Sequence, residues 1–464
     1  MTTNRINQVN PEIFREYDIR GLVEPDLTDD LARLVGKGLG TCVRRARGQR
    51  IALGRDCRMS SPRLRDALLD GLLSTGCDVL DLGVVPTPLT YFAANTLAVD
   101  GLAMITGSHN PADYNGFKLG VGHTTFWGEE IQRLRALIES GDFEQGRGQV
   151  KTWDITTPYL DFIRQEIGAL KRAFKVVVDA GNGVGGLVAL PMLRALGCEV
   201  IELFCEPDGR FPNHHPDPTV EKNLGALIAA VRAHGADLGI AYDGDADRVG
   251  VVDEQGTILW GDELTLLFAR ALLERCPGAT IVGEVKCSMR FYDGIAARGG
   301  RAVMCKAGHS IIKARMKAEG ALLAGEMSGH IFWKDRYFGF DDALYSTARL
   351  LELLDEKRTP LSLLLADLPK TAATPEIRRD AITESRKFEI VRRAVAHFKA
   401  EGRPVDETDG ARITFENGWG LVRASNTQPI LVLRFEAETP EALTRIQGNV
   451  EAALAHIEAQ LPLP

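Results

Sequence analysis

The sequence lacks the features that mark secreted, membrane-spanning and thiolate-metal proteins. Its first residues, MTTNRINQVN, have no basic start followed by an apolar core, so no signal peptide is expected. The longest uncharged stretch, residues 82–99, carries Pro86 and Pro88 and is too weakly apolar to span a bilayer. The eight cysteines are scattered without a CxxC pair or a metal-ligand spacing. This pattern is typical of reduced thiols, and we expect a cytoplasmic protein.

The chain also lacks an excess of basic residues. It has 55 Lys and Arg against 63 Asp and Glu, a net charge of −8, which argues against general binding to nucleic acids or membranes. An anionic substrate would therefore need a local basic site. With 464 residues, 45% of them hydrophobic and 25% charged, the composition is that of a globular enzyme with three or four domains.

Three segments, residues 50–83, 174–204 and 279–310, share one order of expected elements. Each has a β-rich run, a loop, a helix that ends in glycine, and a second β-rich run. Such units predict parallel strands in α/β layers, with functional loops at the carboxyl ends of the strands. We expect three related α/β domains with mixed sheets, each lending a loop to a shared site. The glycines expected at the helix C-caps are Gly76, Gly197 and Gly300.

The C-terminal region follows another pattern. Three runs, residues 411–418, 419–424 and 429–438, read as strands with a turn at Asn417-Gly418, and a helix follows to about residue 460. This pattern predicts a smaller α+β domain. The four predicted domains are residues 1–154, 155–257, 258–369 and 370–464.

A serine stands in a tight loop after a short apolar strand. The sequence T-G-S-H-N-P, residues 106–111, places Ser108 at the strand's end, and Gly107 permits close approach of the backbone. A serine hydroxyl needs a base, a cation or a metal to act as a nucleophile, and His109 and Lys118 are local candidates. A turn serine that caps a helix is the alternative. The segment does not fit the GxSxG elbow of hydrolases.

Three aspartates alternate in the segment D-G-D-A-D-R. If the segment is extended, Asp243, Asp245 and Asp247 share one face, and their charges repel unless a cation lies between them. Carboxylate oxygens favour Mg²⁺ or Ca²⁺ over Zn²⁺. An EF-hand would explain Glu254 at the twelfth position, but Arg248 stands where that loop needs glycine and the flanks read as strands. A solvated acidic turn is the other alternative, and we interpret the segment as a metal site.

Two further polar loops suit a phosphorylated sugar. In G-E-M-S-G-H, residues 325–330, Glu326 and Ser328 alternate and can accept hydrogen bonds from neighbouring hydroxyls. In R-A-S-N-T-Q-P, residues 423–429, a guanidinium, two hydroxyls, an amide and backbone N–H groups form a plausible phosphate cradle. An ordinary polar turn is the alternative for each loop. The local basic site would be completed by Tyr17, Arg20, Lys286 and His309.

Taken together, YDIRG, TGSHNP, DGDADR, GEMSGH and RASNTQP resemble the α-D-phosphohexomutase family, specifically its bacterial phosphomannomutase/phosphoglucomutase members. The motifs occur in the family's order over essentially the whole chain. The resemblance implies three similar α/β domains and a smaller fourth one around a central cleft. It also implies an enzyme that moves a phosphoryl group between C1 and C6 of a glucose or mannose phosphate, through a phosphoserine and a hexose 1,6-bisphosphate.

The resemblance further implies roles for individual residues. Ser108 would be phosphorylated and, with Asp243, Asp245 and Asp247, would hold Mg²⁺. Glu326 and Ser328 would read the sugar hydroxyls. The phosphate that is not transferred would be held by Arg423, Ser425, Asn426 and Thr427. Nearby contacts or acid–base candidates would be Tyr17, Arg20, Lys118, Arg248, Lys286, His309 and His330. We expect Lys118 or His330 to be the base.

Two alternatives to this function remain at the level of sequence. Phosphoglucosamine mutases are similar but more often carry Gln where Met327 stands. A nicotinamide-dependent oxidoreductase is the alternative from another class, because Gly181, Gly183 and Gly186 fit GxGxxG after a strand and Glu202 follows at a suitable distance. That fingerprint leaves the other loops without a role.

Overall fold

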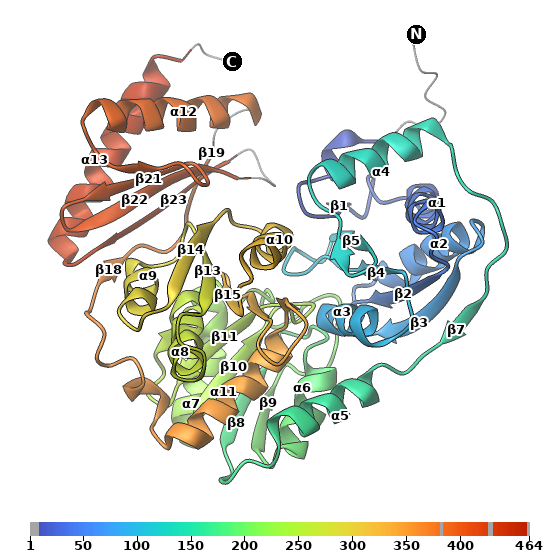
Figure 1. Ribbon diagram of the computed structural model, residues 1–464, viewed down its shortest axis with the longest axis horizontal. Coiled ribbons are helices and arrows are strands. Elements are labelled where there is room, and N and C mark those ends of the chain that lie inside the picture. Colours follow the sequence, from blue (N-terminus) through green and yellow to red (C-terminus); the bar gives the residue numbers. More distant parts are fainter. Residues whose placement is uncertain (1–8, 381–383, 426–429, 462–464) are drawn as a thin grey trace. The chain divides into compact units, whose positions relative to one another are not determined.

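The computed structural model divides into two compact units (Figure 1). The residues that it describes are 9–380, 384–425 and 430–461. Unit 1 is formed by the chain up to residue 271 and by residues 322–365, and unit 2 by residues 272–321 and from 366 onwards.

A seven-stranded mixed sheet organises the N-terminal part of unit 1. Its elements are β1 (Ile19–Leu22), α1 (Asp29–Arg45), β2 (Arg50–Arg55), α2 (Ser61–Leu73), β3 (Asp78–Val84), α3 (Thr87–Thr96), β4 (Gly101–Ile105), β5 (Tyr114–Val121), β6 (Thr124–Thr125), α4 (Glu129–Ser140) and β7 (Val150–Thr152). The strand order is β1-β5-β4-β2-β3-β7, with β6 beside β5. Strand β2 is parallel to β3 and β4, whereas β5 runs antiparallel to β4.

Apolar side chains on one face of this sheet pack against helices. Ile51 and Leu53 alternate along β2, as Ala103 and Ile105 do along β4, and all four belong to one buried core with α1, α2 and α4. Figure 1 shows α1 and α2 side by side. The loops that follow β2 and β4 carry polar residues.

A second mixed sheet in unit 1 repeats this order of elements. Its elements are α5 (Thr156–Ile167), β8 (Lys175–Asp179), α6 (Gly186–Ala195), β9 (Glu199–Leu203), α7 (Gly225–His234), β10 (Leu238–Tyr242), β11 (Val249–Asp253) and β12 (Ile258–Leu259). Helix α8 (Gly261–Arg275) follows, and its last four residues belong to unit 2. The strand order is β12-β11-β10-β8-β9. Strands β8, β9 and β10 are parallel, and β11 runs antiparallel to β10.

The third repeat follows the same chain order. In unit 2 it has β13 (Thr280–Glu284), α9 (Met289–Ala296), β14 (Arg301–Cys305) and α10 (His309–Glu319). In unit 1 it has β15 (Leu323–Gly325), β16 (Ile331–Trp333), β17 (Phe340–Asp341) and α11 (Ala343–Lys357). Strands β13 and β14 are parallel, and β15 and β16 are antiparallel. The parallel pairs of all three repeats confirm the sequence prediction.

The repeats place their polar loops at one topological position. The serine loop joins β4 to β5, the aspartate loop joins β10 to β11, and the GEMSGH loop joins β15 to β16. In each case the second strand returns antiparallel beside the first. Each loop therefore begins at the carboxyl end of a strand, where ligand sites of α/β sheets lie.

The C-terminal region of unit 2 is an antiparallel sheet with two helices. Its elements are β18 (Ala372–Ala373), β19 (Ile377–Asp380), α12 (Glu384–Ala400), β20 (Val405–Asp406), β21 (Ala411–Phe415), β22 (Gly418–Ala424), β23 (Ile430–Ala437) and α13 (Pro440–Ala459). The strand order is β18-β23-β22-β21-β20, with β19 also on β23, and α12 and α13 share its core. The architecture thus confirms three α/β repeats and a smaller α+β domain.

Some local expectations differ from the structure. Gly76 and Gly197 adopt positive φ after their helices, but in the third repeat Gly299 does so, with φ 73°, and Gly300 does not. A Cβ on Gly300 would lie 2.8 Å from Ile295, so packing explains that glycine. Strands β21 and β22 pair Phe415 with Gly418, so their turn lies one residue earlier than predicted.

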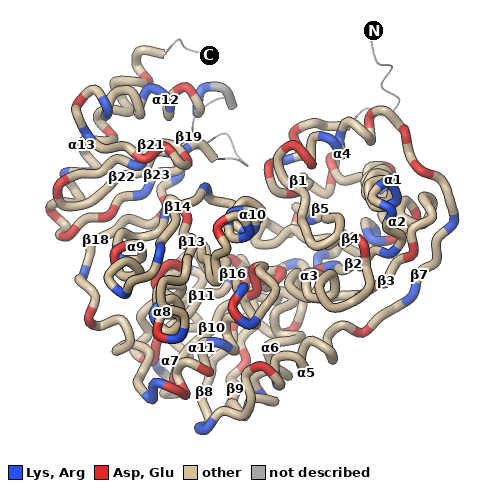
Figure 2. The backbone as a smooth tube through the Cα atoms, viewed as in Figure 1, with Lys and Arg blue, Asp and Glu red and all other residues tan. Residues whose placement is uncertain are grey.

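The distribution of charge agrees with the absence of a basic excess. Lys and Arg are intermixed with Asp and Glu along the described chain (Figure 2). Among the described helices, none combines the length and the apolar composition that crossing a membrane requires.

Candidate active site

Ser108 sits in a constrained loop between β4 and β5. It is 4% exposed and has φ 48°, in the left-handed region that a serine seldom adopts. Its N–H donates to Oγ1 of Thr106 at 2.8 Å. Its Oγ donates to Oδ2 of Asp243 at 2.8 Å and lies 3.2 Å from Nδ1 of His109. The loop therefore holds the hydroxyl against the aspartate loop of the next repeat.

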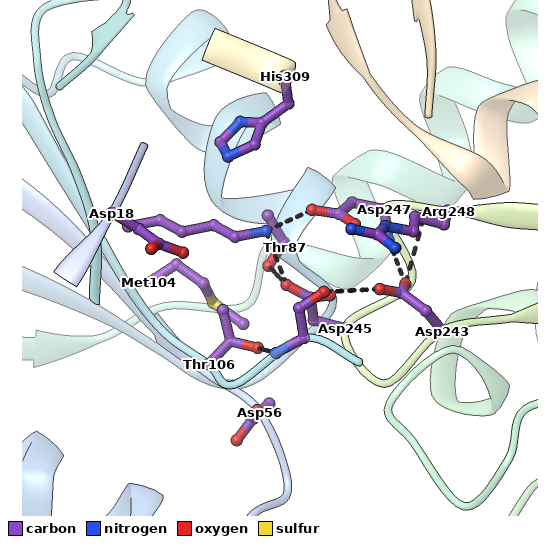
Figure 3. Close-up of polar contacts among 12 residues, drawn as sticks. Asp18, Asp56, Thr87, Met104, Thr106, Asp243, Asp245, Asp247, Arg248 and His309 are labelled. Carbon is purple, nitrogen blue, oxygen red and sulfur yellow. Dashed lines mark hydrogen bonds and ion pairs between the residues drawn. The ribbon is translucent and has the colours of Figure 1, made fainter. Parts of the chain in front are cut away.

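The three aspartates converge through a turn rather than through the alternation of a strand. The segment is not extended: Ala246 has φ 57°, and its N–H donates to the carbonyl of Asp243 at 3.1 Å. The period-two argument was therefore wrong in its geometry, although the carboxylates still meet. Asp243, Asp245 and Asp247 are fully buried, and one oxygen from each lies within 4.8 Å of the others (Figure 3).

A lysine and several donors surround the trio. Nζ of Lys118, on β5, lies 3.0 Å from Oδ2 of Asp245 and also pairs with Oδ2 of Asp247. The Thr87 hydroxyl donates to Oδ2 of Asp245 at 2.6 Å, as Figure 3 shows. Oδ1 of Asp243 accepts from the backbone N–H groups of Asp247 and Arg248. The first and second repeats are thus joined through their loops.

Two oxygen atoms of the trio suit a divalent cation. Oδ1 of Asp245 and Oδ1 of Asp247 are buried, and neither accepts a hydrogen bond from the described residues. Buried carboxylate oxygens in folded proteins have partners, and hard oxygen ligands are those of Mg²⁺ and Ca²⁺. The residues present therefore fit a metal ion beside Ser108.

Burial and neighbouring charges divide the protonation states. Burial, with the charges of Asp245 and Asp247, raises the pKa of Asp243 well above its ordinary value. Burial opposes ionisation of Asp245, but Lys118 and Thr87 hold its pKa well below the ordinary value. Burial likewise opposes the charge of Lys118, yet the two aspartates raise its pKa. Lys118 is therefore a cation in this site.

The side chain next to Ser108 is held neutral. Burial, followed by the charges of Arg248 and Arg20, lowers the pKa of His109 well below its ordinary value. A neutral imidazole 3.2 Å from the Ser108 hydroxyl can accept its proton.

Arg20 contacts the serine loop directly. Its Nη1 donates to the carbonyl of Gly107 at 2.6 Å and to Oδ1 of Asn110 at 3.2 Å, and Nη2 pairs with Asp18. Tyr17 is half-buried three residues before it. The YDIRG segment thus reaches the site through β1, which pairs with β5.

The GEMSGH loop lies beside the aspartate loop. The N–H of Val249 donates to the carbonyl of Gly329 at 3.1 Å. Nε of Arg248 donates to Nε2 of His330 at 3.0 Å, and Nδ1 of His330 lies 3.0 Å from Asp341 and 3.6 Å from Asp247. Unit 1 therefore brings His330 together with the trio. Glu326 in the same loop is buried, and Ser328 is partly exposed.

Two predicted ligand residues of unit 2 have acidic partners. Lys286, after β13, is 8% exposed, and its Nζ lies 3.1 Å from Oε2 of Glu376, whose pKa it lowers to about 2. Arg423, at the end of β22, donates from Nε to Oδ2 of Asp409 at 3.0 Å. The same oxygen accepts the N–H of Ala307 at 3.1 Å.

The remaining predicted residues of unit 2 are placed only in part. His309 is the first residue of α10 and is buried. The carbonyl of Ser425 accepts a hydrogen bond from the buried Lys387 at 2.7 Å. Asn426 and Thr427 lie outside the described residues.

Protein atoms fill the space at the GxGxxG glycines. A Cβ on Gly183 would lie 2.6 Å from the carbonyl oxygen of Gly244, and one on Gly186 would lie 2.5 Å from that of Cys205. A Cβ on Gly181 would approach Pro216 at 2.9 Å. Gly183 thus permits close packing against the aspartate loop, and Gly181 and Gly186 permit it against Pro216 and Cys205, so the dinucleotide interpretation loses its structural basis.

Several residues of the site had no role in the sequence argument. They are Arg58, Thr87, Asp341, Glu376 and Asp409, and each contacts a predicted site residue or its loop. Arg58 and Thr87 follow the carboxyl ends of β2 and β3, so their position after parallel strands was an available signal. Asp341 and Asp409 carry no comparable signal, because the strands that precede or contain them pair antiparallel and neither residue follows a parallel strand.

Comparison with known proteins agrees with this arrangement. Family models described as phosphoglucomutase/phosphomannomutase, alpha/beta/alpha domains I, II and III and the C-terminal domain match residues 11–145, 157–256, 260–372 and 366–453. A phosphomannomutase/phosphoglucomutase of Pseudomonas aeruginosa is 49% identical, covering 100% of both chains. A phosphoglucomutase of Neisseria gonorrhoeae is 46% identical, covering 96% of this chain and 97% of the relative.

A solved structure gives the same result. A phosphoglucomutase/phosphomannomutase family protein of Burkholderia thailandensis superposes with a TM-score of 0.92 and 44% identity, covering 98% of this chain and 100% of that one. The chain belongs to the phosphoglucomutase/phosphomannomutase family.

Proposed function

We propose that the protein is a Mg²⁺-dependent phosphomannomutase/phosphoglucomutase that uses Ser108 as its phosphoryl carrier. The observation that carries this proposal is the contact between the Ser108 hydroxyl and Asp243, at the edge of a buried aspartate trio. The full-length relatives named for this activity support it. We also propose that the protein is cytoplasmic and that its domains meet near residues 154, 257 and 369.

The reaction consists of two balanced transfers. In the first, the P–Oγ bond of phosphoserine 108 breaks as a hydroxyl oxygen of the hexose phosphate bonds to phosphorus. The hydroxyl proton passes to a base, and Oγ takes up a proton to become the serine hydroxyl. The product is a hexose 1,6-bisphosphate. After it turns around, Oγ of Ser108 gives up its proton and bonds to the other phosphorus. The P–O bond to the sugar breaks, and the sugar oxygen takes up a proton, which gives the isomeric monophosphate. Positioning and electrostatic stabilisation dominate such transfers.

The charges around Ser108 suit this chemistry. Asp243, Asp245 and Asp247 would hold Mg²⁺ together with an oxygen of the phosphoserine. When bound, Mg²⁺ would neutralise charge on the transferring group. Lys118, a cation on the other side of the trio, would add to that stabilisation, and its raised pKa makes it a poor base.

Proton transfer falls to the histidines of unit 1. His109 is neutral and lies within reach of Oγ, so it would take the serine proton in the return step. His330 is our candidate base for the sugar hydroxyl. Its Nε2 accepts from Arg248 in this structure, and the sugar hydroxyl would replace that donor when the proton is transferred. Arg20 fixes the serine loop and adds positive charge to it.

The remaining predicted residues would bind the substrate, a glucose or mannose phosphate. Glu326 and Ser328 would accept and donate hydrogen bonds at the sugar hydroxyls, as a buried carboxylate with a nearby hydroxyl can. The phosphate that is not transferred would be bound by Arg423, Ser425, Asn426 and Thr427, with further contacts from Tyr17, Arg248, Lys286 and His309.

A mutase assay with Ser108→Ala tests the proposal. The wild type should interconvert the 1- and 6-phosphates of glucose and mannose in the presence of Mg²⁺ and a trace of hexose 1,6-bisphosphate. Ser108→Ala should lose turnover by several orders of magnitude and, in intact-mass spectra, should not gain the phosphoryl group. Ser140→Ala, an exposed serine at the end of α4, is the matched control and should behave as wild type. Turnover of Ser108→Ala near that of the control would exclude the covalent route.

A further inference from the structure

A polar segment after β2 contacts the serine loop on the side away from the aspartate trio. The sequence D-C-R-M-S-S, residues 56–61, runs from the end of β2 into α2. Oδ2 of Asp56 accepts the N–H of Gly107 at 3.1 Å, and Oδ1 accepts the Ser61 hydroxyl at 2.5 Å. In Figure 3, Asp56 lies on the side of the Thr106 loop away from the aspartate trio.

Arg58 in this segment uses every donor of its side chain. It is 1% exposed, and all five N–H groups of a guanidinium have acceptors here. Nε donates to Oδ2 of Asp56 at 3.2 Å, and the ring of Phe211 lies 4.9 Å from Cζ. The other four donors go to backbone carbonyls of the serine loop, those of Ser108, Asn110, Pro111 and Tyr114.

These hydrogen bonds hold the part of the loop whose backbone conformation is energetically unfavourable. Nη2 of Arg58 binds the carbonyl of Ser108 at 2.8 Å and that of Asn110 at 2.6 Å, on either side of His109. The left-handed backbone of Ser108 persists only where its surroundings hold it. The guanidinium packs so closely that a Cβ on Gly107 would lie 2.4 Å from Cζ.

We infer that Arg58 is a positioning residue for the phosphoryl carrier: its planar set of five donors holds the loop in the one conformation that points Oγ of Ser108 at Asp243. This inference rests on the proposed function and adds to it a residue with no contact to substrate or metal. Lysine offers three donors without the planar arrangement, so it cannot bind four carbonyls and a carboxylate at once. Charge alone is therefore not what the position requires.

Single-turnover phosphoryl transfer tests the inference. The protein is first phosphorylated with glucose 1,6-bisphosphate, and transfer from phosphoserine to glucose 1-phosphate is then followed by intact mass. Arg58→Lys should slow this transfer on the order of 10²-fold, as a small displacement of a reacting group does. The KM for glucose 1-phosphate should change less than about threefold, because Arg58 does not bind the sugar.

A matched control separates this effect from a loss of stability. Arg349 on α11 is also buried, donates to Asp335 and Tyr345, and stacks on Trp333 at 4.2 Å. Arg349→Lys should lower the urea midpoint of unfolding but leave the transfer rate within about threefold of wild type. Equal transfer rates in Arg58→Lys and Arg349→Lys would overturn the inference.

A second variant keeps the test decisive if Arg58→Lys folds poorly. Gly107→Ala retains the arginine but places a methyl group against its guanidinium, and it should slow transfer in the same way. The double variant should be no slower than Arg58→Lys alone, because both changes act through one contact. Additive losses would refute the mechanism. Absence of transfer in the wild type would instead refute the proposed function.

Discussion

Replacing Lys118 with methionine removes the cation that separates two buried aspartates. Lys118 is only 3% exposed. Its Nζ lies 3.0 Å from Asp245 and also pairs with Asp247. Without it, the trio has no compensating charge from a buried side chain of β5. Removing one partner of a buried ion pair costs about 3–5 kcal/mol, because the remaining charge stays desolvated.

The stability loss should depend on metal. In EDTA, urea unfolding of Lys118→Met should show a loss of about 3–5 kcal/mol relative to wild type. Saturating Mg²⁺, at about 100 times its Kd, should restore about 2.7 kcal/mol to a protein that binds it only when folded. The gain should be larger in the variant than in the wild type at one Mg²⁺ concentration, because a competing cation has been removed.

A strand lysine with an exposed partner is the control. Lys175 on β8 lies 3.5 Å from Glu199, and its side chain is 35% exposed. Lys175→Met should cost less than about 1 kcal/mol and should not change the response to Mg²⁺. Were Lys118→Met as stable as Lys175→Met in EDTA, with the same gain from Mg²⁺, the ion pairs would not stabilise the trio and our account of the site would fail.

Two further predictions concern other carboxylates. Burial raises the pKa of Asp342 to about 7, so the folded state holds a proton that the unfolded state has lost, and stability falls as pH rises through this range. Urea unfolding should show the wild type losing about 2–3 kcal/mol more than Asp342→Asn between pH 5 and pH 8, and identical pH profiles would contradict this. Asp409→Asn removes the charge that orients Arg423, so steady-state assays should show a KM for hexose phosphate raised roughly tenfold with kcat less affected. A change in kcat alone would place Asp409 outside substrate binding.

The chemistry of the site was readable from the sequence, but its geometry was not. The serine loop and the aspartate loop were each identified from residue types, and their contact followed only from the packing of two sheets. The alternation of the aspartates suggested a strand, whereas left-handed Ala246 shows that a turn brings them together. Local spacing cannot distinguish the two, because both place carboxylates on one side.

Residues that act on the backbone were harder to find. Arg58 carries no motif of its own, and its acceptors are carbonyls that any sequence supplies. Asp409 precedes β21 and Arg423 lies near the end of β22, so the pairing of these two strands brings them into contact. Gly300 shows the same limit: packing against Ile295 and a helix cap both call for glycine.

The shared hairpin position of the three loops has a consequence for how such a protein can change. The proposed nucleophile, cation ligands and sugar-binding side chains lie on separate sheets, each in the loop that joins a strand to its antiparallel neighbour. His330 ties the third hairpin to the aspartate loop through Arg248 and Asp247, so it must be kept. Our proposal assigns Glu326 and Ser328 to the sugar hydroxyls instead, which makes these two positions the place to graft a new preference among sugars.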